Sequence, residues 1–170
     1  MRILIVGAGI AGCALYRRLE PLGHEIDIIE KSSELASEGA AICLPANAML
    51  ALEQLDLAEQ VKQLAFQVDK IEYALSSGKT LASASLHEAP LNKAPFVALK
   101  RDALMSVLRD GMATDVQLNT WPTALSQENK EVSVSFNTGA CKTYDLVVAA
   151  DGINSATSCL LYTSASPRDS

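Results

Sequence analysis

The stretch RILIVGAGIAG, residues 2–12, decides the fold of this chain. Residues 2–6 are largely apolar and β-branched, which predicts a strand that stops at the first glycine. Apolar side chains recur at helical spacing over residues 11–22, and residues 25–29 predict a second strand that ends on Glu30. A strand, a helix and a strand within about 30 residues make a βαβ unit. Such a unit implies a parallel sheet with a right-handed crossover.

The glycines after the first strand predict a dinucleotide site. They match G-x-G-x-x-G, in which the first glycine permits the turn, the second lets backbone amides approach a pyrophosphate, and the third lets helix and strand pack closely. The phosphates then lie at the positive end of the helix. Glu30 would accept hydrogen bonds from the adenosine ribose and repel a 2′-phosphate, so the fingerprint fits NAD or FAD and disfavours NADP. The predicted cofactor-binding residues here are Gly7, Ala8, Gly9, Ile10, Ala11, Gly12, Glu30 and Lys31.

The rest of the chain alternates between helix and strand patterns. Helices are predicted over residues 47–55, 58–64 and 102–108, the last with Asp102 as its N-cap. Strands are predicted over residues 68–75, 80–86, 131–136 and 146–150, the first two as a hairpin and the last as fully buried. We therefore predict an α/β fold, a Rossmann-type βαβ domain on a mixed sheet with an inserted β element.

Composition limits the classes of function. The chain has 170 residues, a net charge of −6 and 49% apolar residues, which fits a soluble acidic domain and argues against nucleic acid or an anionic membrane as partner. The longest apolar runs fall far short of the roughly 20 residues of a membrane span. Glycines interrupt the N-terminal apolar run, which argues against a secretory signal. The cysteines lack C-x-x-C spacing and histidine partners, so we expect mostly buried, reduced thiols, no metal site and a cytoplasmic protein.

Three later segments resemble the motifs of one enzyme family. Residues 39–48 (GAAICLPANA) with 52–57 (LEQLDL) resemble G-x-G-I-x-L-x-x-N-A…L-x-x-L-G-L. Residues 99–104 (LKRDAL) resemble an R-x-x-L helix start, and residues 145–155 (DLVVAADGINS) resemble D-L-V-V-x-A-D-G-x-x-S. Together with the glycine loop, and in the same order, they resemble the class A FAD-dependent aromatic hydroxylases of the para-hydroxybenzoate hydroxylase type.

The resemblance implies FAD as the cofactor, with Arg101 near its ribityl and phosphate region and Asp151 and Gly152 on the pyrophosphate side. It also implies NAD(P)H as electron donor and a monooxygenase that hydroxylates an aromatic or similar small substrate with O2. No catalytic acid or base is identified. The alternatives are another flavin oxidoreductase of this fold, such as a reductase or halogenase, or a non-catalytic fragment that does not retain FAD. Glu30 concerns the FAD adenosine, so NADH and NADPH both stay open as donors.

The last residues differ in character from the rest. The family pattern D-G-x-x-S-x-x-R implies an arginine where this chain has Ser158, and residues 159–169 (CLLYTSASPRD) resemble a translated cloning adaptor. We therefore expect a partial FAD-binding domain over residues 1–157, with a substrate-domain-like β insertion at about residues 66–99. Residues 158–170 are expected to be a non-native tail, since residues 159–170 show neither a helical nor a strand period. A domain truncated in this way would expose sheet edges and apolar faces.

Overall fold

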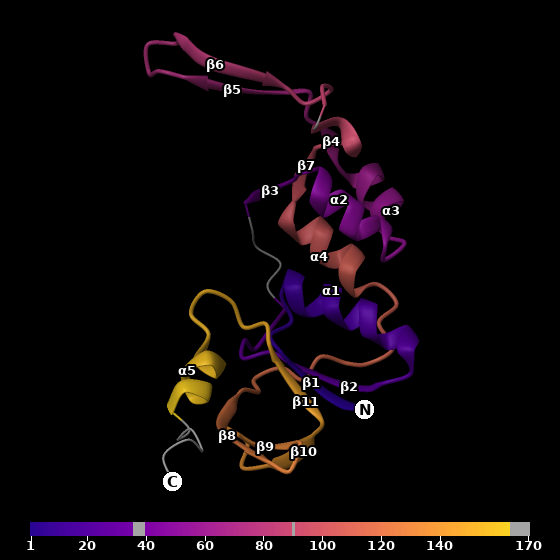
Figure 1. The fold of residues 1–170 in the computed structure, drawn as a ribbon, viewed down its shortest axis with the longest axis vertical. Helices are drawn as coiled ribbons and strands as arrows, with labels where there is room; N and C mark the ends of the chain where they lie inside the picture. Colours follow the sequence, from indigo (N-terminus) through magenta and orange to yellow (C-terminus); the bar gives the residue numbers. More distant parts are fainter. Residues whose placement is uncertain (36–39, 90, 164–170) are drawn as a thin grey trace. The chain divides into compact units, whose positions relative to one another are not determined.

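The computed structural model describes residues 1–35, 40–89 and 91–163 (Figure 1). Part of one predicted motif, at residue 39, and the end of the predicted tail lie outside the described residues. The chain divides into two compact units, one made of residues 1–36 and 108–170 and the other of residues 37–107.

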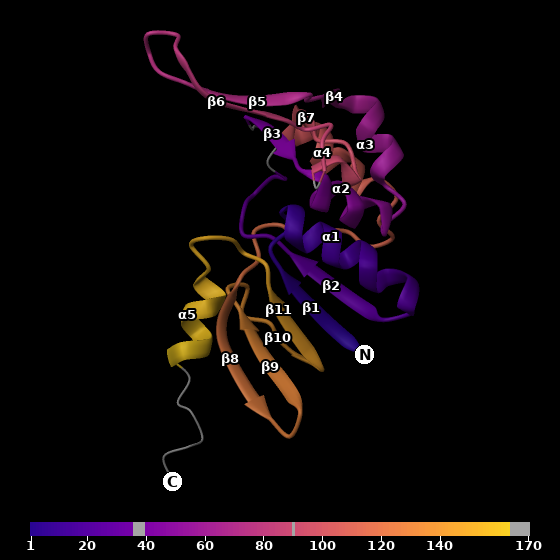
Figure 2. The ribbon, with the colours of Figure 1, turned by 45° about the horizontal axis from the view of Figure 1, so that its top comes forward.

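The first unit contains the predicted βαβ arrangement. Strands β1 (Arg2–Val6), β2 (Glu25–Ile29) and β11 (Leu146–Ala149) form a parallel sheet in the order β11-β1-β2 (Figure 2). Helix α1 (Ile10–Leu19) continues into a 3₁₀ turn, η1 (Glu20–Leu22), and Gly23 ends it in the left-handed conformation with a φ of 73°. The predicted strand–helix–strand order and the glycine stop are confirmed.

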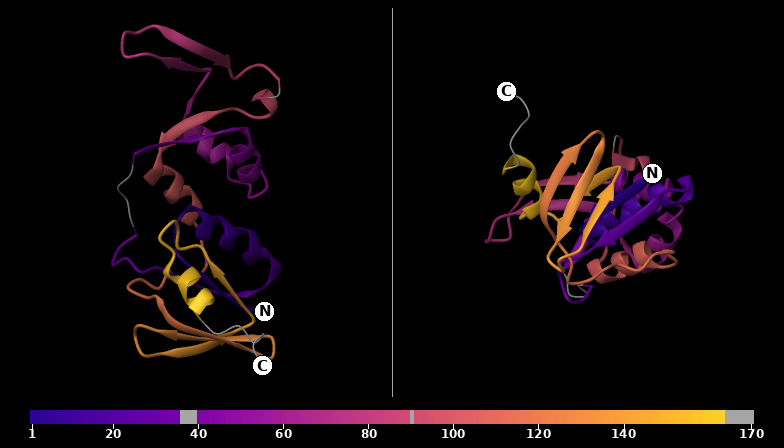
Figure 3. Two further views of the ribbon diagram at one scale, coloured as in Figure 1. Left: turned by 60° about the vertical axis from the view of Figure 1, so that its left-hand side comes forward. Right: turned by 90° about the horizontal axis from the view of Figure 1, so that it is seen from below.

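The parallel sheet is covered on both faces, which explains why β11 and residues 3–6 of β1 are continuously apolar. Ile5 faces α1, because a Cβ added to Gly12 of that helix would lie 3.3 Å from Ile5 Cγ2. Leu4, Val6 and Ile29 point to the other face. There they pack against the antiparallel sheet of β8 (Pro122–Glu128), β9 (Glu131–Phe136) and β10 (Cys141–Tyr144) (Figure 3). Helix α5 (Ala156–Thr163) follows β11 and lies beside β8.

The second unit combines helices with two small antiparallel sheets. One sheet has the order β3-β7-β4 and the other is the hairpin β5-β6, in which Lys70 pairs with Ser85. The hairpin prediction is therefore confirmed. The elements are β3 (Ala41–Leu44), α2 (Ala46–Glu53), α3 (Ala58–Leu64), β4 (Phe66–Gln67), β5 (Lys70–Ala74), β6 (Thr80–Ser85), η2 (Leu91–Lys93), β7 (Val97–Lys100) and the start of α4 (Arg101–Arg109).

Several local predictions are wrong. The sheet is not mixed, because parallel and antiparallel strands belong to separate sheets. The last parallel strand is not fully buried: β11 pairs with β1 alone within its sheet, and Leu146 is 41% exposed. Asp102 is not an N-cap, since α4 begins at Arg101 and Asp102 Oδ1 accepts a bond from the adjacent Ala103 amide at 2.8 Å. Residues 158–163, which show neither a helical nor a strand period in the sequence, form the rest of α5.

The burial of the cysteines differs from the prediction of mostly buried thiols. Cys13 is buried, whereas Cys43, Cys141 and Cys159 are exposed, because the latter three lie in short strands or a helix with a solvent face. Within the described ranges, no helix has both the length and the apolar character needed to cross a bilayer.

Candidate functional site

The predicted site residues of the first unit meet at the carboxyl ends of its three parallel strands. The Gly7 amide donates to Ile29 O at 2.8 Å, and the Ala150 amide donates to Val6 O at 2.8 Å. The glycine loop, Glu30 and the Asp151-Gly152 turn therefore leave neighbouring strands side by side. In open α/β sheets this edge is where ligands bind.

The surroundings of the three loop glycines differ, and so does the reason for a glycine at each position. Gly7 has a φ of +105°, and a Cβ there would lie 2.5 Å from Ala150 O, so only glycine fits between the two strand ends. A Cβ on Gly12 would collide with the carbonyl oxygen of Gly7, which keeps helix α1 close to the strand. A Cβ on Gly9 would meet no described atom within 4 Å. Gly9 thus borders open space at the start of α1, where the fingerprint predicts the pyrophosphate.

The N-terminus of α1 suits an anion. The first helical bond runs from the Cys13 amide to Gly9 O at 2.9 Å, so the amides before it have no partner along the helix. Among the described residues, no side chain caps Gly9, and the first turn carries no acidic residue. The positive end of the helix dipole is therefore not neutralised there by a carboxylate of the helix itself. A diphosphate fits this open, positively polarised position.

The Glu30 side chain is tied to the glycine loop. Its Oε2 accepts a bond from the Ala8 amide at 3.0 Å, and its Oε1 accepts one from the Ser32 amide at 3.0 Å. Burial opposes ionisation, but these two amides and the charge of the exposed Lys31 outweigh it and lower the pKa of Glu30 below its ordinary value. The carboxylate keeps further acceptor capacity, which ribose hydroxyls could use.

The backbone of Glu30 is held by a segment that the sequence patterns did not identify. The Glu30 amide donates to Gln117 O at 2.9 Å, and the Thr120 amide donates to Glu30 O at 3.0 Å. Gln117 also forms an isolated parallel bridge with Ile29. These contacts use backbone atoms of an irregular loop, so no residue pattern signals them.

The Asp151 side chain serves the fold around the site. Its Oδ1 accepts a bond from Ser155 Oγ at 2.5 Å, and its Oδ2 accepts bonds from the Thr157 amide at 3.1 Å and from Thr157 Oγ1 at 2.9 Å. Burial opposes ionisation, but these bonds outweigh it and lower the pKa of Asp151. Gly152 follows with a φ of +83° and is exposed. The carboxylate is thus directed to the start of α5, and the Gly152 backbone is the part of this turn that stays open.

Arg101 belongs to the second unit. It is the first residue of α4, and its amide donates to Ala40 O at 3.4 Å. Its role toward the flavin stays a prediction.

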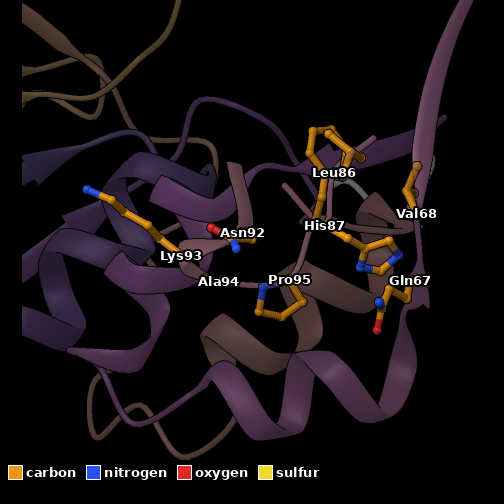
Figure 4. Close-up of a pocket in the computed structure, with 9 residues that line it drawn as sticks. Gln67, Val68, Leu86, His87, Asn92, Lys93, Ala94 and Pro95 are labelled. Carbon is orange, nitrogen blue, oxygen red and sulfur yellow. The ribbon is translucent and has the colours of Figure 1, made fainter. Parts of the chain in front are cut away.

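The second unit has a pocket of about 310 Å³ that none of the predicted site residues lines (Figure 4). His87 Nε2 pairs with Asp69 Oδ1 at 3.0 Å beside it, but the two side chains are 59% and 67% exposed. A side-chain contact exposed to this degree contributes little energy. The pocket lining comprises Gln67, Val68, Leu86, His87, Asn92, Lys93, Ala94, Pro95 and Phe96.

The fold and the loop define a dinucleotide-binding α/β domain of the Rossmann type. The model of the FAD binding domain family matches residues 1–165, so this chain belongs to that family.

The chain is similar to proteins named as a monooxygenase and a hydroxylase and to a structure solved with FAD. The chain is 28% identical over 157 residues to a flavin-dependent monooxygenase of Legionella longbeachae, covering 92% of this chain and 40% of that protein. It is 30% identical over 167 residues to the salicylate hydroxylase of Pseudomonas putida, covering 92% and 37%. The structure of Klebsiella pneumoniae HpxO complexed with FAD superposes with a TM-score of 0.79 at 27% identity, covering 92% and 41%. The chain therefore spans about 40% of the length of relatives such as these.

Proposed function

We propose that this chain is the FAD-binding part of an FAD-dependent monooxygenase that uses NAD(P)H and O2 to hydroxylate a small aromatic substrate. The observation that carries the proposal is the meeting of the glycine loop, Glu30 and the Asp151-Gly152 turn at one edge of the parallel sheet. The monooxygenase relatives support the type of reaction, and the salicylate hydroxylase supports an aromatic substrate.

The residues divide the work of holding the cofactor. The open position at Gly9 and the amides of the first turn of α1 would receive the pyrophosphate. Glu30, ionised and fixed by Ala8, would accept the adenosine ribose hydroxyls. Gly152 would approach the pyrophosphate side with its backbone, and Asp151 would hold that turn in place through α5.

FAD, when bound, supplies the redox chemistry by accepting electrons from the nicotinamide donor and reacting with O2. This chain's part is to bind and orient it. Arg101 is proposed to contact the ribityl and phosphate region. No side chain of the described residues is assigned as a general acid or base.

Two alternatives follow from the same residues. Another flavin oxidoreductase of this fold, a reductase or a halogenase, would use the same nucleotide site. A non-catalytic chain would keep the same fold but would not retain FAD.

Titration of the 170-residue chain with FAD, followed by quenching of flavin fluorescence, tests the binding. We expect saturable binding even where little FAD co-purifies, and weaker binding by Glu30→Gln. Absence of saturation at millimolar FAD would refute the cofactor proposal.

The reaction is tested on the protein from the complete reading frame. NADH or NADPH oxidation should rise with a phenolic substrate and yield a hydroxylated product that contains one oxygen atom from ¹⁸O2. Substrate turnover without O2 would contradict the monooxygenase and favour a reductase. A halogenated product formed in the presence of chloride or bromide would favour a halogenase.

A further inference from the structure

Arg109 lies against the glycine loop, although no motif points to it. It is the last residue of α4 and belongs to the same compact unit as the loop. Its Nη2 donates to Ala8 O at 3.5 Å. The preceding carbonyl, Leu108 O, accepts a bond from Arg17 Nε of α1 at 3.0 Å, which fixes this end of α4 on α1. The guanidinium is thereby held near the first turn of α1.

The Arg109 guanidinium has no carboxylate at ion-pair distance among the described residues. Its Nε is buried and has no hydrogen-bond partner there. Leaving such a charged donor unpaired costs free energy.

The ionisable neighbour Cys13 does not supply the missing negative charge. Its Sγ donates to Ala8 O at 3.3 Å, the same carbonyl that Arg109 contacts. Burial raises the pKa of the Cys13 thiol above 9.0, and the nearby guanidinium offsets this only in part. Cys13 is therefore a neutral thiol at pH 7.

Two positively charged or polarised groups therefore lie close together: the Arg109 guanidinium and the N-terminus of α1. A guanidinium stands beside the N-terminal turn of α1, whose own dipole is positive and whose first turn has no acidic residue. The ionised Glu30 on the Ala8 amide offsets part of this positive charge, but it forms no ion pair with Arg109 among the described residues, so an anion at the start of α1 is still favoured. A diphosphate in the open position at Gly9 is an anion of the required charge.

We infer that Arg109 determines the affinity for the dinucleotide diphosphate, by adding positive charge behind the glycine loop and holding the Ala8 carbonyl. The inference rests on the proposed nucleotide site but assigns to Arg109 a role of its own. The ligand group it serves is the diphosphate, and neither the adenosine nor the flavin ring is involved.

Three variants separate charge from fold. Arg109→Gln removes the charge but keeps a donor for Ala8 O, and Arg109→Lys keeps the charge without the planar fork. Arg18→Gln is the matched control, because it removes the same charge from an exposed position near the other end of α1. Arg18 lies nine residues beyond Gly9, about 13 Å along the helix, where salt screens its effect on the first turn.

The dissociation constants of ADP, adenosine and FAD are measured by calorimetric or fluorescence titration of the 170-residue chain. We expect Arg109→Gln to weaken ADP and FAD about tenfold, the order that one partly screened charge supplies, and to leave adenosine within about twofold. Arg109→Lys should retain most of the affinity, and Arg18→Gln should match wild type. The salt dependence of ADP binding should also become shallower in Arg109→Gln.

Equal losses for ADP and adenosine would overturn the inference, because they would show that Arg109 acts only on the fold. So would unchanged ADP binding by Arg109→Gln. If Arg109→Gln does not fold, Arg109→Lys decides, since a tenfold loss of ADP affinity with the charge retained contradicts the proposed role. Wild-type chain that binds neither ADP nor FAD would instead refute the proposed function itself.

Discussion

Gly12→Ala tests the packing of the glycine loop, because two physical effects predict opposite signs. Gly12 lies inside α1, where alanine is favoured over glycine by about 1 kcal/mol of helix propensity. The added methyl, however, would collide with the carbonyl oxygen of Gly7 and lie 3.3 Å from Ile5 Cγ2. A backbone carbonyl has no alternative rotamer, so the collision must move α1 away from β1.

Overpacking of this kind costs about 1–3 kcal/mol where side chains can adjust, and we expect the upper end here because the obstacle is backbone. After subtraction of the propensity gain, the net loss should be about 2 kcal/mol. For a chain of this length that lowers Tm by roughly 4–8 °C. Gly9→Ala is the control: its methyl meets open space among the described atoms, and the lost preference of an N-cap glycine costs about 1 kcal/mol at most.

Urea unfolding followed by circular dichroism measures both changes without any ligand. FAD titration then adds a second contrast, because Gly9→Ala should fold normally yet bind FAD more weakly. A Gly12→Ala chain as stable as wild type, or more stable, would refute the steric argument.

Two further predictions concern titratable groups. Tyr144 OH donates to Asp27 Oδ2 at 2.6 Å and joins the antiparallel sheet to β2, so Tyr144→Phe should lower the free energy of unfolding by about 1.5 kcal/mol in urea unfolding. Burial, and then the Asp27 carboxylate, raise the pKa of Tyr144 above its ordinary 10.0. Wild type should therefore lose the stability that this bond contributes as pH rises beyond 10, and Tyr144→Phe should not. Parallel pH profiles of the two chains would contradict this prediction. Glu30 and Asp151 have pKa values below their ordinary 4.5 and 3.8, so their contribution is complete above those values and is lost as pH falls through the folded values. Unfolding measured from pH 7 to pH 3 should therefore show a shallower acid loss for Asp151→Asn than for wild type, and an unchanged slope would exclude this contribution.

The βαβ unit was predictable because its signals are local. A strand, the glycine loop, an amphipathic helix and Glu30 follow one another within 30 residues, and each has its own residue pattern. Helix α3 and strand β9 were predicted with their observed bounds for the same reason.

The missed elements depend on distant partners. Strands β3 and β7 are four residues each and exist by pairing Ala41 with Lys100 through Leu44 with Val97. Neither has an alternation long enough to register as a strand. Which sheet a strand joins is likewise set by packing, and so the expectation of a single mixed sheet was wrong.

The site, like the fold, combines features with a local sequence pattern and features that depend on distant contacts. Gly7, Gly12 and Glu30 are visible as a motif, but the contact of Glu30 with Ala8 and the support from Gln117 depend on three-dimensional placement. Arg109 has no motif at all, because its position near the loop follows from how the end of α4 lies on α1.

The pairing of β1 with β11 also sets the order in which the domain can be completed during synthesis. Ile3 pairs with Leu146, and 116 positions separate Glu30 from Leu146. A ribosome adding about 5–20 residues per second needs roughly 6–23 s for that stretch. Throughout this time the apolar β1 has an unpaired edge, and Gly7 lacks the strand end against which it fits. The βαβ unit therefore emerges with one sheet edge exposed, and the packing of Gly7 against Ala150 is completed only after β11 has been synthesised.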